Sequence, residues 1–489
     1  MNKRWIGLVL WSISLTFLGQ NEEDIFRYSY LEALGSARSM GMGGAFGALG
    51  ADLSCTTGNP AGLGFYRRGD LGITTGFASQ KTKLRINEQL GLGNKLSGAM
   101  TNLGIALSYP SVNPDSPVST LAVTYTKRAN YNQSISSGEV VFESSLLDDF
   151  LNAAQGHQAG DLFYSLPFTG GLAWEAHLLD PHPNNNPTEY ISAIPSGGVN
   201  TTKTIERTGD LSEMNIAFGT GLWETLYMGV TLGIVGVDFT EETSHQENPT
   251  LDSLNLSQWK FREDLNISGS GLNLKIGVIA TATSWLRLGL AYHFRTFLSL
   301  TDEYSTGIES TFKDGNQYDL VSPFNQTEYV INTPSRWLVS AAFILGKAGV
   351  VSADYEYVNY ANGQLKPTSF ADSDAYDFAA ENEALNVAYG SSHTARVGAE
   401  FRIKRAWRVR LGAGMETSPY TDAAQVAADA TRYTASTGWG YRSEKWYGSM
   451  TYRRSWREQD LYLFSPDLVE AGKLGNTHGM VVFAVGFRL

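Results

Sequence analysis

The sequence predicts an all-β protein, a 14-stranded antiparallel β-barrel that spans a membrane. Three observations lead to this prediction. The last nine residues, Val481 to Leu489, alternate bulky apolar residues with small or charged ones. Segments with the same alternation recur along the chain, and short turns alternate with long polar segments between them. A membrane barrel has this pattern because one face of each strand meets lipid while the other faces a wet lumen.

Composition supports a β-rich chain and excludes several other classes. Only 18% of the 489 residues are charged, 12% are aromatic and 51 are glycine. The mean hydropathy of -0.19 is too polar for a bundle of membrane-spanning helices. The net charge of -12 argues against nucleic acid as a partner, and the single cysteine, Cys55, excludes an internal disulfide.

The N-terminus has the pattern of an export signal. The basic start Met1 to Arg4 precedes a mostly apolar run, Trp5 to Leu18, and then a polar region. This run is shorter than the roughly 20 apolar residues that a spanning helix needs. We therefore expect a signal peptide over residues 1–20, which is removed on export.

Alternating segments give the candidate strands in order. In Leu272 to Ala280, for example, every second residue is apolar and the residues between them include Asn273 and Lys275. The sixth candidate carries Ser-Gly-Ser-Gly at 268–271, which indicates a kink or bulge. The fourteen candidates are 71–79, 103–109, 119–127, 213–221, 226–240, 257–282, 284–296, 334–346, 348–358, 393–404, 406–416, 434–442, 445–455 and 479–489.

Tryptophan and tyrosine residues near the predicted strand ends favour an aromatic girdle at the membrane surface. They are Trp285, Trp337, Trp407, Trp446 and Tyr447.

The longest polar segment, 128–212, is predicted to be an extracellular loop with two amphipathic helices, at 144–154 and 172–179. Their apolar residues either cap the barrel or line a groove that captures a ligand, and the sequence leaves both readings open. The candidate capture residues are Leu147, Phe150, Leu151, Leu172, Trp174 and Leu178.

Charged residues on the predicted lumen faces are expected to pair across the lumen, while one or two free arginines could hold a ligand carboxylate. The candidates are Lys275, Arg287, Arg336, Arg396 and Arg402. No Walker motif, G-x-S-x-G or H-E-x-x-H motif occurs, so the sequence favours neither an enzyme nor a cofactor or metal site.

The glycine-rich stretch Ser36 to Gly50 precedes the first strand. It fails the dinucleotide motif G-x-G-x-x-G, because Phe46 stands at the third glycine position and no strand precedes it. Glycines allow close packing and Asn59-Pro60 favours a turn, as a segment folded back into the lumen needs. We expect residues 21–69 to form a plug and residues 70–489 to form the barrel.

The residues also resemble a known family. Ser36 to Gly50, Asn59 to Gly62, Leu286 to Tyr292, Asn332 to Arg336, Ser352 to Tyr357 and Arg396 to Arg402 are similar to segments of the FadL/TodX-like outer-membrane transport proteins, particularly the Bacteroidetes type. The resemblance implies a 14-stranded barrel in the Gram-negative outer membrane, with an N-terminal hatch in its lumen and helices in an extracellular loop. The hatch residues it points to are Gly41, Gly43, Gly44, Asn59, Pro60 and Ala61.

This resemblance also implies a function. A monomeric channel would take up small hydrophobic molecules, such as long-chain fatty acids or aromatic hydrocarbons, with outer-membrane lipid as a further partner. Loop helices would capture the ligand, the hatch would shift, and the ligand would leave sideways at a kink in the third strand, near 119–127.

Two alternatives remain from the sequence. Similar barrels hold cargo proteins as shuttle subunits of type IX secretion, and a haem-uptake barrel is a third possibility that lacks a convincing histidine pair. The 128–212 segment distinguishes the first alternative, because paired amphipathic helices favour ligand capture while a floppy polar loop favours protein binding.

Overall fold

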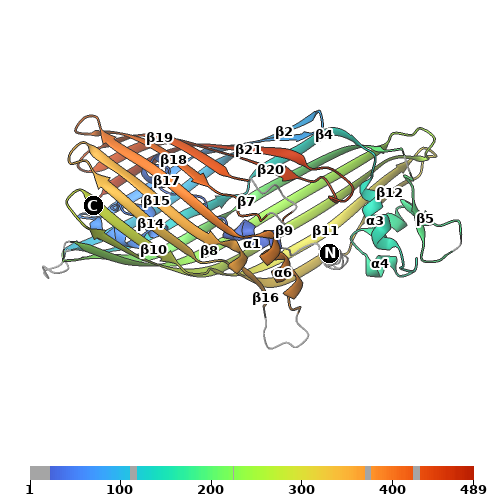
Figure 1. The fold of residues 1–489 in the computed structure, drawn as a ribbon, viewed down its shortest axis with the longest axis horizontal. Coiled ribbons are helices and arrows are strands. Elements are labelled where there is room, and N and C mark those ends of the chain that lie inside the picture. The colour runs from blue at the N-terminus through green and yellow to red at the C-terminus, as the bar shows by residue number, and fades with distance from the viewer. Residues whose placement is uncertain are drawn as a thin grey trace, which may run out of the picture.

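The computed structural model describes residues 22–110, 118–184, 186–195, 197–223, 225–368, 376–421, 424 and 430–489. The chain forms a closed antiparallel barrel of 14 strands with helices inside it and at one end (Figure 1). Closure is direct, because β1 (Asp70–Ile86) pairs with β21 (Gly472–Arg488) from Asp70 and Arg488 to Arg85 and Lys473. The predicted fold class is therefore confirmed. The predicted signal peptide, residues 1–20, lies outside the described residues.

Several of the barrel strands are interrupted and the others are continuous. In chain order after β1 they are β2 (Gln89–Pro110), β3 (Val118–Asn130), β7 (Val199–Leu222), β8 (Leu226–Pro249), β9 (Leu256–Thr281), β10 (Leu286–His293) continued by β11 (Phe297–Phe312), β13 (Asn325–Asn332) continued by β14 (Arg336–Ile344), β15 (Gly349–Asn359), β17 (Ser391–Arg402), β18 (Trp407–Glu416), β19 (Arg432–Arg442), β20 (Trp446–Leu461) and β21.

An apolar belt surrounds the outside of the barrel. On β8, Met228, Val230, Leu232 and Ile234 are 40–45% exposed, whereas Tyr227 and Val235 face inward and are buried. Apolar residues of this kind face outward on strand after strand, as the lipid-facing surface of a membrane barrel requires. No helix among the described residues is long and apolar enough to cross a membrane.

Much of what the sequence predicted as long loops is strand. β7 begins at Val199 and β8 reaches Pro249, so paired strands continue far above the apolar belt. Outward residues there are polar, such as Asp238 and Glu242 on β8, and the apolar alternation that marked the strands is lost. The predicted loop boundaries 128–212 were wrong for this reason, and the connection above the wall runs from 143 to 198.

The predicted kink at 268–271 was also wrong. β9 pairs with β8 through these residues without a register shift. Gly269 and Gly271 face inward, and Leu298 and Leu300 of β11 lie against them so closely that a Cβ atom would clash. The glycines therefore make room for two buried leucines and do not bend the strand.

The extracellular cap lies at the end opposite the C-terminus (Figure 1). Its helices are α3 (Leu146–Ala154), α4 (Leu162–Ser165) and α5 (Gly170–Glu175), with the short strand pair β5 (Leu179–Pro181) and β6 (Tyr190–Ser192). The helix expected over 172–179 ends at Glu175, because His177 adopts a φ of 56°. Smaller elements at the wall are β4 (Gln133–Phe142), β12 (Gln317–Val321), β16 (Gln364–Pro367), η3 (Tyr360–Asn362) and α6 (Ala379–Ala388).

The segment that precedes β1 fills the lumen. Its helices are α1 (Glu22–Ser29), α2 (Ala37–Gly41), η1 (Leu53–Thr56) and η2 (Pro60–Phe65). Gly43 has a φ of 68° and a Cβ atom there would lie 3.0 Å from Ala413 N of β18, so its backbone lies directly against the wall. On another part of the wall the glycines belong to the strands, where Gly229 and Gly277 leave space for Pro60 and Asn59 of the plug. Bare backbone on both sides allows this plug to pack tightly.

Candidate functional site

The six candidate capture residues meet in one apolar cluster beneath the cap. Leu147, Phe150, Leu172 and Leu178 are 0%, 5%, 1% and 0% exposed, and Leu151 and Trp174 pack against the same cluster. Phe150 contacts two aromatic rings of β9, at centroid distances of 6.1 Å to Trp259 and 5.1 Å to Phe261. This arrangement closes the extracellular end of the barrel, so a ligand reaches these side chains only when the cap moves. Their capture role stays a prediction.

A buried carboxylate fastens α3 to the wall. Glu247 of β8 is 0% exposed and accepts hydrogen bonds from Ser145 Oγ, from Leu146 N at 2.9 Å and from Trp259 Nε1 at 3.0 Å. The ring of His245 shares a fourth hydrogen bond with it, at 2.8 Å. Because Ser145 is also the N-cap of α3, this one side chain holds the start of the helix.

A cavity of about 380 Å³ lies between α1 and the wall. It mixes aromatic rings with charged groups, and its lining includes Tyr30, Tyr131, Phe239 and Tyr420 together with Arg207 and Arg457. Gln80 of β1 and Gln133 of β4 also line it. The cavity therefore reaches the wall at the point where β3 passes into β4.

At this point the strand pairing is interrupted. β2 and β3 pair from Pro110 and Val118 only as far as Asn102 and Thr126. Among the described residues, no pairing joins β2 residues 89–101 to β3 or β4, although β1 pairs with β2 residues 89–100. β3 has a register shift between Lys127 and Ala129 where this ladder ends. The resemblance placed a kink in the third strand near 119–127, and the irregularity lies just after that range.

Where the pairing stops, the edge formed by β1 and β2 overlaps the edge formed by β4 and β7, and polar contacts hold the two edges together. Thr82 Oγ1 of β1 donates to Ser134 O at 2.6 Å, and Lys95 Nζ of β2 lies 2.9 Å from Glu206 Oε2 of β7. Gly91 and Gly93 of β2 lie so close to the β4 backbone that a Cβ atom would overlap with its carbonyl oxygens. The seam between β2 and β4, made by these contacts and without a hydrogen-bond ladder, is closed in this structure.

Four of the five lumen cations are engaged. Arg336 and Arg396 each lie 2.8 Å from Glu356, and Lys275 pairs with Glu213. These pairs join nearby strands of one wall, and the expected pairing across the lumen does not form because the plug occupies the space. Arg287 instead donates to Leu49 O of the plug at 3.2 Å. Arg402 lies exposed at the rim, and its side chain has no hydrogen-bond or ion-pair partner among the described residues.

Several wall residues bind the plug through its backbone. Asp354 Oδ2 of β15 accepts from Phe46 N at 2.8 Å and from Gly47 N at 2.9 Å. Asn59 Nδ2 donates in the opposite direction to Val278 O of β9 at 3.2 Å. Thr101 Oγ1, at the last unpaired residue of β2, donates to Gly35 O at 2.8 Å.

The six predicted hatch residues all lie in this segment. Pro60 and Ala61 are buried against the wall at Gly229, Gly41 lies against Arg410 of the wall strand β18, and Gly44 packs on Ala33 within the plug. The plug thus touches the wall both beside the seam and far from it. Movement of the plug remains a prediction.

Solved structures share this architecture. A Pseudomonas aeruginosa FadL homologue matches with a TM-score of 0.58 and 11% identity over 94% of this chain and 99% of its own. The P. putida toluene transporter TodX matches with a TM-score of 0.56 and 11% identity over 94% and 99%. The fold is that of the FadL/TodX channels. The CymD monoaromatic hydrocarbon channel has the same FadL/TodX fold, with a TM-score of 0.51 and 12% identity over 93% of this chain and 97% of that one.

Sequence comparison gives no further evidence, because no protein-family profile and no curated protein match the chain. A closed FadL/TodX barrel with an outward apolar belt is built for the Gram-negative outer membrane. The expected location is therefore confirmed.

Sequence reasoning missed the residues that fasten the cap to the wall and hold the seam closed. Glu206 and Glu247 sit in polar stretches above the apolar belt, where one charged residue resembles the next, and Lys95 is a single charge between Leu92 and Leu96. A signal was present only at β2, where Gly91 and Gly93 repeat at the spacing of one strand face.

Proposed function

We propose that this protein is an outer-membrane channel that takes up small hydrophobic molecules and performs no catalysis. The observation that carries the proposal is the interrupted β2–β3 pairing beside the lumenal cavity. An apolar solute is stabilised by about 25 cal/mol per Å² of apolar surface that leaves water. A side exit lets it pass from the cavity into the bilayer without returning to water, which a water-filled pore would require.

The route has three stages. The apolar cluster under α3 and α5 takes the ligand when the cap opens, and the ligand then enters the cavity beside α1. The plug shifts, the seam opens at Thr82 and Lys95, and the ligand leaves between β2 and β4. Packed helices in the cap favour this reading over a protein-binding barrel, whose loop would be polar and unfolded.

The proposed substrates are long-chain fatty acids or aromatic hydrocarbons. The rings of Tyr30, Tyr131, Phe239 and Tyr420 in the cavity lining support this class, because aromatic side chains offer large apolar faces. The names of the TodX and CymD channels refer to toluene and to monoaromatic hydrocarbons, which supports aromatic hydrocarbons as the substrates.

A cross-link across the seam tests the proposal. Lys95→Cys/Glu206→Cys places two thiols where an ion pair now spans the seam, and a short bis-maleimide with a reducible bond joins them. Uptake of radiolabelled oleate and toluene is measured in cells that lack other channels of this kind. We expect the cross-link to abolish uptake and its reduction to restore it.

The matched control joins two strands that are already paired. Lys473→Cys/Asp460→Cys replaces an ion pair between β21 and β20, and its cross-link leaves the seam free. We expect normal uptake in the control. Undiminished uptake with the seam cross-linked, or equal loss in the control, would contradict lateral release.

A further inference from the structure

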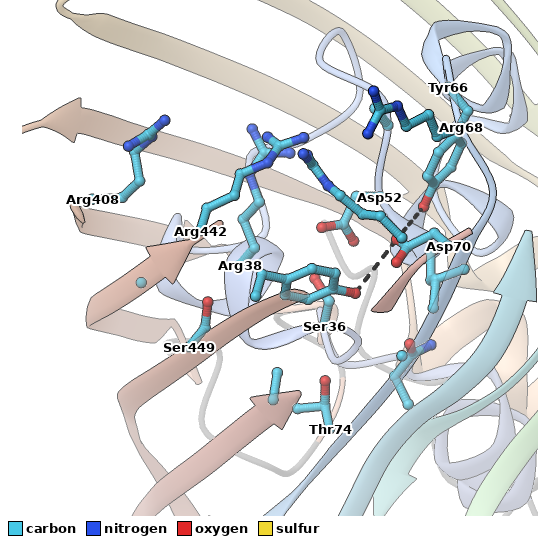
Figure 2. Close-up of a pocket in the computed structure, with 18 of the residues that line it drawn as sticks. Ser36, Arg38, Asp52, Tyr66, Arg68, Asp70, Thr74, Arg408, Arg442 and Ser449 are labelled. Atoms are coloured by element: carbon cyan, nitrogen blue, oxygen red, sulfur yellow. Dashed lines mark hydrogen bonds between the residues drawn. The ribbon is translucent and has the colours of Figure 1, made fainter. Parts of the chain in front are cut away.

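A second pocket, of about 260 Å³, lies at the other end of the plug. Figure 2 shows Arg38, Arg68, Arg408 and Arg442 around it, together with Tyr66 and Asp70. Arg442 and Arg488 are the last residues of β19 and β21, so the pocket lies at the rim with the short turns. In outer-membrane barrels this rim faces the periplasm.

The charge of this pocket is opposite to that of the protein. Seven arginines line it, against the three carboxylates Asp52, Asp70 and Glu400, and no lysine or histidine does. The lining therefore carries a formal charge of +4, while the whole chain carries -12. Arginines concentrated in this way need a source of negative charge or a solvent-exposed position.

None of the three carboxylates is paired with Arg67, Arg68 or Arg442 among the described residues. Glu400 binds Arg38 through two hydrogen bonds of 3.0 and 3.1 Å and Arg410 through one of 2.6 Å. Asp70 Oδ2 accepts from the hydroxyls of Tyr66, at 3.0 Å, and Tyr447, at 3.4 Å. Asp52 caps η1 by accepting from Ser54 N.

Three arginines consequently face the pocket with free guanidinium groups. Arg67, Arg68 and Arg442 are exposed, and their guanidinium groups have no hydrogen-bond or ion-pair partner within the described part of the chain. Arg408 is bonded only to backbone carbonyls, those of Arg405 and Trp407. The free groups come from the plug junction on one side and from β19 on the other.

Glycine and tyrosine residues shape the space between them. A Cβ atom at Gly440 would lie 2.7 Å from Arg410, and one at Gly72 would lie 2.6 Å from the Tyr447 hydroxyl. Tyr447, predicted from the sequence to be part of the outer girdle, turns inward here and packs on Gly72 and Gly486. The pocket thus has apolar walls of Phe65, Tyr66 and Tyr447 beneath a ring of guanidinium groups.

We propose that this pocket binds the carboxylate or phosphate group of a small molecule that reaches the barrel from the periplasm. Guanidinium groups bind both oxyanions through paired, charge-assisted hydrogen bonds. The apolar walls accept a short alkyl or aryl portion attached to the anion. This site is separate from the cap and from the cavity beside α1, and its charge and lining do not depend on the proposed uptake function.

Calorimetric titration of the full barrel in nanodiscs of zwitterionic lipid tests the proposal. The probes are hexanoate, inorganic phosphate and the neutral analogue 1-hexanol. We expect at least one anion to bind, to weaken as salt rises, and to bind about tenfold more weakly to Arg68→Ala/Arg442→Ala. Hexanoate alone would assign a carboxylate with an apolar tail, and phosphate alone would assign the free anion.

The control variant removes the same charge elsewhere. Arg85 and Arg454 are exposed on the outer face of β1 and β20, and Arg85→Ala/Arg454→Ala leaves the pocket intact. We expect this variant to bind as the wild type does. Lack of binding by both anions, equal binding of 1-hexanol, or equal weakening in the two double variants would overturn the proposal.

Discussion

Glu247 gives the sharpest test of how the cap is held closed. Its Oε1 accepts from Leu146 N and bonds the ring of His245, while its Oε2 accepts from Ser145 Oγ and Trp259 Nε1. Glu247→Gln keeps the shape of the side chain but turns one of the two oxygens into an NH₂ group, which cannot accept. Two hydrogen bonds are then lost, at about 1 kcal/mol each.

The expected destabilisation is therefore about 2 kcal/mol, which corresponds to about 30-fold more frequent opening of α3. Hydrogen exchange of α3 peptides, measured by mass spectrometry on the barrel in detergent, reports this opening directly. Glu242→Gln is the matched control, since Glu242 is an exposed residue of the same strand. If α3 exchanges at the wild-type rate in Glu247→Gln, or as fast in the control, the anchoring role is refuted.

Three further predictions concern the cap and the plug. Burial raises the pKa of Asp149 to about 6, so the cap is most stable below about pH 4 and loses stability, by about 1 kcal/mol after solvent screening, as pH rises through 6. Asp149→Asn should abolish this rise in α3 exchange between pH 4 and 7, corrected for intrinsic rates. Gly43→Val meets Ala413 N at a positive φ and should impair oleate uptake while the barrel still assembles, as judged by heat-dependent gel mobility. In the control Gly346→Val, at a turn of φ 57° with open space around it, both uptake and assembly should be normal. Asp354→Asn should raise exchange of plug residues 45–48 about tenfold, because a charged acceptor for two amides becomes neutral, and an unchanged rate would contradict that contact.

Strand faces could be predicted because lipid imposes a period of two on a single residue class. Leu272, Leu274 and Ile276 face outward as that period requires, and closure by the last strand followed from the same pattern. Strand lengths could not be predicted, because above the apolar belt both faces are polar and the period carries no contrast. Where both faces of a strand meet water, the sequence alone does not show how far the strand extends.

The plug contacts escaped prediction for a different reason. Phe46 and Asp354 are 308 positions apart, and their hydrogen bond runs from a backbone amide that every residue except proline possesses. The glycine-rich composition indicated that the segment needed close approach, but it did not indicate the surface that it approaches. The seam likewise depends on an absent ladder, which leaves no mark on either strand except Gly91 and Gly93.

The length of the strands fixes where uptake would begin. β9 has 26 residues, which at about 3.3 Å each and a tilt of about 40° reach a height of about 65 Å. The apolar band of such a barrel is only about 25 Å tall, so about 40 Å of wall stands above the lipid. In an outer membrane that height passes through the inner saccharides of the lipopolysaccharide layer. The cap would therefore meet an apolar molecule beyond these sugars, and the molecule would cross them enclosed by protein.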